Sequence, residues 1–173
     1  MIYIELFIVS HLGEYTVRYT RLGKTSDGRN PDLLVNEMLQ KAFSEGLTET
    51  SVPLIIHSTS WRHESPDTIV LTYLAYSDDF LPLGKAHTAT KIIQCNPSGT
   101  PKETNLQAPR PAQICEEDVV IHGLQHLAFI ARREYEKTLN LLLSDASKAF
   151  LFSLSPEISG QLTPFPLPKF SES

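Results

Sequence analysis

The segment from residue 116 to residue 143 constrains the fold most strongly, because it carries the longest helical period in the chain. Val120, Leu124, Leu127 and Ala131 recur at helical spacing and share one side of the predicted helix. Apolar residues also occupy the other sides of its first half, so we expect this helix to be long and buried at the centre of the fold. A shorter helix is expected around residues 145–154.

Two strand-like stretches open the chain. Residues 2–9, IYIELFIV, consist largely of residues with high strand propensity, and residues 14–22 alternate between apolar and polar side chains. The sequence SHLG at 10–13 predicts a turn that joins them as a hairpin. The polar run GKTSDGRN at 23–30 predicts an exposed loop.

A helix is predicted to follow this loop. Asn30 is a favourable N-cap, Pro31 suits the first helical position, and Asp32 complements the positive end of the helix dipole. Gly46 is a plausible stop, because glycine readily adopts the left-handed conformation that ends helices. The apolar stripe of the helix consists of Leu34, Met38, Leu39, Ala42 and Phe43.

A pair of strands at 52–63 and 68–76 is predicted next, joined by a turn at Pro66-Asp67. A further strand is predicted at 87–95, and the proline-rich stretch 96–111 is expected to be a long exposed loop. This order of elements predicts an α+β fold with a largely antiparallel sheet. One medium helix and one long central C-terminal helix should pack on that sheet.

The length of 173 residues fits one domain, predicted at 1–154, followed by a proline-rich tail at 155–173. A formal net charge of −5 argues against a nucleic-acid partner, which usually selects a basic face. The apolar N-terminus lacks signal-peptide features and is too short to span a membrane, so we expect a cytoplasmic protein with Cys95 and Cys115 reduced. No cofactor is predicted.

The stretch HSTSWRHESPD, residues 57–67, contains the first candidate site. Strand alternation would place four of its side chains on one face of the sheet. Whether the hairpin loop has two or four residues, the same residues of the next strand would join that face. Such a face predicts a ligand groove in which an aromatic ring stacks and polar groups hydrogen-bond. Alternatively, it is a sheet face covered by a loop, with the tryptophan in the core. The candidate ligand-binding residues are His57, Thr59, Trp61, His63, Thr72 and Tyr76.

His122 and His126 form the second candidate site, because a spacing of four places both on one face of a helix, as in metal-binding helices. No glutamate follows His122, so the pair does not match the metalloprotease pattern. A third ligand would have to come from elsewhere, such as His57 or His63. Two histidines four residues apart often arise by chance, so we interpret the pair as buried, hydrogen-bonded histidines or surface histidines and assign no metal ligands.

Motifs of nucleophile elbows, P-loops and dinucleotide-binding loops are absent from the sequence. Two classes of function therefore stay open. The first is a non-catalytic module that binds a small molecule or a partner protein. The second is a hydrolase or metal-dependent enzyme that uses His57, His63, His122 or His126.

The combination of HSTSWR, LTY and HGLQHLAF resembles an uncharacterised family of bacterial proteins over residues 52–135, and this resemblance implies no function. A second resemblance is to the Nudix fold, in which a helix ending like SEGL precedes paired strands. Magnesium binding in that family needs several Arg and Glu residues on the helix, whereas DLLVNEMLQKAFSEGL has no Arg and carries only Glu37 and Glu45 in its body. The resemblance therefore implies the fold without diphosphate hydrolysis.

Overall fold

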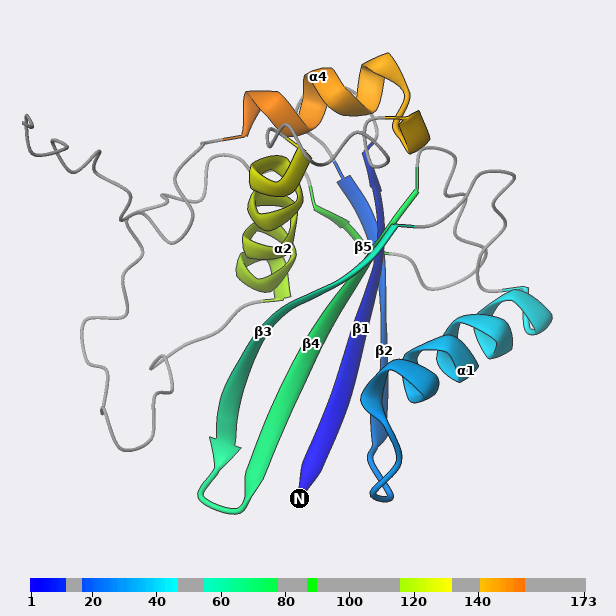
Figure 1. Cartoon of the computed structure of the whole chain (residues 1–173), viewed down its shortest axis with the longest axis vertical. Helices are drawn as coiled ribbons and strands as arrows, with labels where there is room; N and C mark the ends of the chain where they lie inside the picture. Colours follow the sequence, from blue (N-terminus) through cyan, green and yellow to red (C-terminus); the bar gives the residue numbers. More distant parts are fainter. Residues whose placement is uncertain (12–16, 47–54, 78–86, 90–115, 132–140, 155–173) are drawn as a thin grey trace, which may run out of the picture.

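The computed structural model describes six parts of the chain, which build a five-stranded sheet with helices on both faces (Figure 1). The strand order is β3-β4-β1-β2-β5, and the class is α+β. The sheet is mixed, because β1 and β4 pair in parallel at its centre while the other pairings are antiparallel. The described residues are 1–11, 17–46, 55–77, 87–89, 116–131 and 141–154.

The N-terminal hairpin consists of β1 (Ile2–His11) and β2 (Val17–Thr25). Both faces of β1 are buried because helices cover both sides of the sheet, which explains its nearly continuous apolar sequence. Two predicted boundaries were wrong. Ser10 and His11, expected in a turn at 10–13, continue the strand, and the expected loop at 23–30 starts only after Thr25.

Helix α1 (Pro31–Ser44) has the predicted caps. The Asn30 side chain accepts a hydrogen bond from the Asp32 backbone N–H at 2.8 Å, and Gly46 adopts a φ of 64° just beyond the helix. The buried stripe packs on one face of the sheet, where it meets Ile4, Leu6 and Ile8 of β1. Phe43 is the member of the predicted stripe that stays partly exposed. The buried residues of α1 are Leu34, Val35, Met38, Leu39 and Ala42.

The second hairpin consists of β3 (Ile55–Ser65) and β4 (Thr68–Tyr76), with Pro66-Asp67 in the predicted turn. Strand β5 (His87–Ala89) pairs with the first three residues of β2, so the described part of this strand is shorter than the predicted 87–95.

Helix α2 (Glu116–Ala131) covers the opposite face of the sheet from α1 (Figure 1). Its predicted buried stripe is confirmed, since Val120, Leu124, Leu127 and Ala131 are at most 2% exposed. Gly123 lets the helix approach closely, because a Cβ there would lie 2.6 Å from a methyl carbon of Leu74.

The predicted helix 116–143 is described as helical only at 116–131 and at residues 141–142, and the intervening 132–140 lie outside the described residues. The short predicted helix is present as α4 (Asp145–Ser153), which crosses one end of the sheet beside α2 (Figure 1). The predicted loop at 96–111 and tail at 155–173 also lie outside the described residues. None of the described helices is long and apolar enough to cross a membrane.

Candidate functional site

The residues that were predicted to share one ligand-binding face lie on both sides of the sheet. His57 pairs with Leu74, whereas Trp61 pairs with Leu71, because the register of β3 on β4 shifts between Ser58 and Ser60. This irregularity inserts one residue, Thr59, and reverses the alternation beyond it. The prediction that His57, Trp61 and His63 share one face was therefore wrong. A second shift occurs between His63 and Ser65.

Three of the predicted residues are buried on the α2 side and bond to other parts of the protein. The Thr59 hydroxyl donates to the Thr72 carbonyl oxygen at 3.3 Å. The Tyr76 hydroxyl donates to Ser147 Oγ of α4 at 3.0 Å and lies 2.9 Å from His11 Nδ1. The Tyr76 contact ties the sheet to α4, and burial leaves Thr59, Thr72 and Tyr76 little surface for a ligand.

His57 of the first predicted site meets the His122 and His126 pair on this side of the sheet. The ring of His126 lies 4.5 Å from that of His122 and 6.0 Å from that of His57, measured between centroids. Burial lowers the pKa of His122 from 6.5 to about 4, with a further contribution from the charge of His126, and burial also lowers the pKa of His126. In the part of the chain that the structure describes, no three His, Cys, Asp or Glu side chains are arranged to hold a metal ion.

A buried ion cluster centred on Glu5 was missed by the sequence reasoning. Glu5 is 1% exposed and accepts hydrogen bonds from Thr72 Oγ1 at 2.6 Å and from Arg21 Nη2 at 3.0 Å. Arg62 donates to both carboxylate oxygens, with Nη2 at 3.0 Å from Oε2. Arg21 also donates to Glu116 at the start of α2, at 2.9 Å. The cluster therefore joins four strands to one helix.

The electrostatics of the cluster keep the carboxylate of Glu5 ionised. Burial by itself would raise the pKa of Glu5, but the hydrogen bonds from Arg62 and Thr72 and the charges of both arginines outweigh it and lower the pKa. The sequence does contain one signal of this cluster, the single acidic residue inside IYIELFIV. A carboxylate on a strand that is buried on both faces needs a cationic partner. The cluster also holds the Arg62 side chain on the face opposite to Trp61.

Trp61 lies on the α1 side of the sheet, where it pairs with Leu71 of β4. Its side chain is 57% exposed and contacts the ring of His63 in a T-shaped arrangement with 5.7 Å between centroids. Ile56 and Ile2 share this face and are 40% and 41% exposed. We call the surface formed by Trp61, His63, Ile56, Ile2, Ile69 and Leu71 the Trp61 face.

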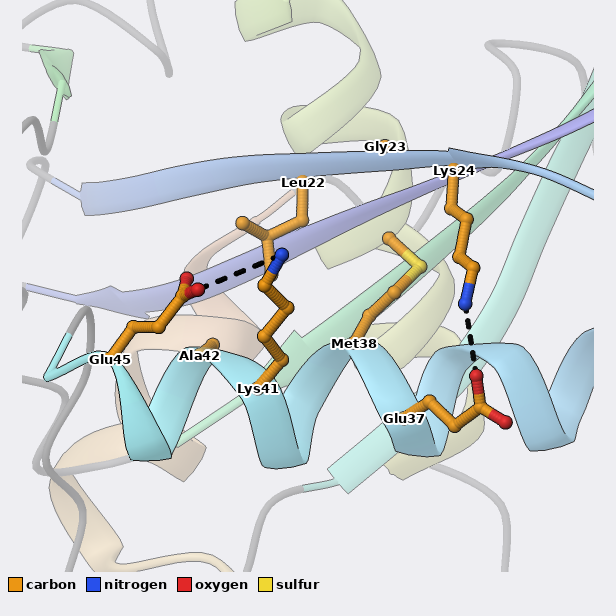
Figure 2. A pocket seen from close by; sticks show the side chains of 8 residues that line it. All are labelled: Leu22, Gly23, Lys24, Glu37, Met38, Lys41, Ala42 and Glu45. Atoms are coloured by element: carbon orange, nitrogen blue, oxygen red, sulfur yellow. Dashed lines mark hydrogen bonds and ion pairs between the residues drawn. The ribbon is translucent and has the colours of Figure 1, made fainter.

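A groove lies on the same face of the sheet but toward its opposite edge, between β2 and α1 (Figure 2). It has a volume of about 490 Å³. Leu22, Met38 and Ala42 supply its apolar lining, and two ion pairs lie along it, Lys24–Glu37 at 2.9 Å and Lys41–Glu45 at 3.6 Å. Gly23 completes the lining.

Comparisons with known proteins give no family for the chain: no family model matches it, and no curated protein matches it significantly.

Proposed function

We propose that the protein is a non-catalytic interaction module that binds a partner protein through the Trp61 face. The observation that carries this proposal is the exposure of a tryptophan and two isoleucines on the same side of the sheet. Tryptophan is enriched among the residues that contribute most to binding energy at protein interfaces, and exposed apolar surface is typical of such interfaces.

The occupant that fits this face is an amphipathic helix of the partner. The Trp61 face continues the same side of the sheet that α1 already covers, since Leu71 packs against the core beneath α1. A sheet face that accepts one helix through an apolar stripe offers the same packing to a second helix laid beside it.

Charge favours a basic helix. Asp67 is exposed at the turn end of the β3–β4 hairpin, and the chain carries a net charge of −5. Arg62, the cation nearest to Trp61 in sequence, lies on the other face, where it is engaged by Glu5 and by Glu64, with 3.6 Å between its Nε and Glu64 Oε2. Lysines or arginines flanking the apolar stripe of the partner helix would therefore be attracted.

Binding through the face is favoured over addition of a strand to the β3 edge. The two register irregularities of β3, at Thr59 and Glu64, interrupt the regular order of backbone groups that an added strand would need. Irregularities of this kind are a common way in which proteins protect an exposed sheet edge.

The sole tryptophan makes the test direct, because its fluorescence reports on this surface alone. A designed amphipathic helical peptide of leucine and lysine should shift the Trp61 emission to shorter wavelength and saturate. The matched peptide of leucine and glutamate should bind at least about tenfold more weakly, owing to charge repulsion.

Variants distinguish binding at the Trp61 face from nonspecific binding of the peptide. Trp61→Ala should weaken binding of the labelled leucine–lysine peptide by about tenfold or more in an anisotropy titration. It should reduce the free energy of unfolding by no more than about 1 kcal/mol, because over half of the side chain is already exposed. Phe152→Ala, which changes an exposed aromatic residue on α4, is the control and should bind normally. Equal binding by wild type and Trp61→Ala would refute the proposal.

A further inference from the structure

Beside the groove, part of the edge of strand β2 carries no pairing strand among the described residues. Strand β5 pairs with Val17 to Tyr19, and among the described residues no strand continues this pairing along Thr20 to Thr25. The groove lies along this stretch, because its lining comes from Leu22, Gly23 and Lys24 on one side and from α1 on the other (Figure 2). An edge and a groove thus run side by side.

The register determines which backbone groups point outward. The Ser26 N–H donates to the Ile2 carbonyl oxygen at 2.8 Å, and the β1–β2 pairing continues from Tyr3 opposite Thr25. In an antiparallel pair, backbone groups point alternately toward and away from the partner strand. Lys24 and Leu22 therefore bond to β1, and Arg21, Gly23 and Thr25 direct their N–H and C=O groups to the open edge.

We propose that this edge binds an extended segment of a partner protein as an added strand, antiparallel to β2 and beside α1. The segment would hydrogen-bond to Arg21, Gly23 and Thr25. Its side chains opposite Leu22 and Lys24 would enter the groove, since residues opposite one another in a sheet share a face. This site lies on the opposite half of the sheet from the Trp61 face and does not depend on it.

The chemistry of the occupant follows from the groove. Its lining between the strand and the helix is apolar, through Leu22, Met38 and Ala42, and the charges along it are already neutralised in pairs. Uncharged apolar side chains at positions i and i+2 are therefore preferred there. The antiparallel direction continues that of β5, which already occupies the first part of the same edge.

Amide hydrogen exchange measured residue by residue tests the edge in the full-length protein. In the protein alone, the amides of Arg21, Gly23 and Thr25 should exchange faster than those of Leu22 and Lys24, which bond to β1. The probe is a cyclised hairpin peptide whose outer strand alternates threonine and valine. It should slow exchange at the three outward amides by at least about tenfold. The matched peptide with aspartate in place of valine should not.

Proline provides the matched variant, because it removes an N–H and is tolerated where that N–H points away from the sheet. Thr25→Pro should weaken binding of the threonine–valine peptide by about tenfold, as expected for the loss of one backbone hydrogen bond, while Thr25→Ala should stay within about threefold of wild type. Trp61→Ala should bind this peptide normally, which separates the two sites. The proposal is overturned if the three outward amides are already protected in the protein alone, or if the peptide binds without protecting them.

Discussion

Acidification should destabilise the protein through the cluster formed by His57, His122 and His126. The pKa of His122 is about 4 in the folded protein and near 6.5 when the chain is unfolded. Because the unfolded chain binds the proton first, the free energy of unfolding should fall as the pH drops below about 6.5 and level off near pH 4. The lowered pKa of His126 acts in the same direction.

The magnitude follows from the size of the shift. At about 1.4 kcal/mol per pKa unit, the change from 6.5 to about 4 at His122 corresponds to roughly 3 kcal/mol in total. About 2 kcal/mol of this loss should occur between pH 7 and pH 5. That interval lies above the range in which carboxylates such as Glu5 begin to bind protons, so the two effects are separable.

Urea unfolding at pH 7, 6 and 5 measures this loss, with His122→Gln as the test variant. Glutamine cannot be protonated, so the variant should lose much less stability over this interval than the wild type. His63→Gln, on the opposite face of the sheet, should retain the wild-type dependence. The reasoning fails if wild type is equally stable at pH 7 and pH 5, or if His122→Gln retains the full dependence.

Three further predictions concern stability at pH 7. Leu127→Ala should cost about 2–5 kcal/mol in urea unfolding because it leaves a cavity under α2, whereas His126→Gln should be much milder; equal losses would mean that the buried face of α2 is misassigned. Glu5→Ala should cost about 3–5 kcal/mol, since it leaves the largely buried Arg62 with only the exposed Glu64 as a counter-charge, and a loss below 1 kcal/mol would contradict the importance of the cluster. Asn30→Ala should lower stability by about 1 kcal/mol, measurable in a thermal melt, through loss of the α1 cap, and Asn30→Asp should restore most of it.

Local sequence signals predicted local structure well. The capping of α1 by Asn30, its end at Gly46 and the turn at Pro66-Asp67 each depend on a few neighbouring residues, and each occurs in the structure. The buried stripe of α2 was also predictable, because it requires only helical periodicity and an apolar face.

The candidate site could not be predicted in the same way, because it depends on contacts between distant residues. Nothing near Thr59 marks the irregularity that sends His57 and Trp61 to opposite faces of the sheet. The ion cluster joins Glu5 to Arg62, 57 residues away, and no local pattern predicts that pairing. The encounter of His57 with His126 likewise requires knowing where α2 lies on β3.

The central parallel pairing of β1 with β4 also affects the order in which the chain folds during synthesis. Ile2 pairs with Ile69, so β1 acquires its neighbour only after 67 further residues have been made. At about 5–20 residues per second, this interval lasts roughly 3–13 seconds. During that time the hairpin of β1 and β2 has one long apolar strand with an unpaired edge, which makes the nascent chain prone to aggregation. The arrival of β4 covers that edge and completes the centre of the sheet.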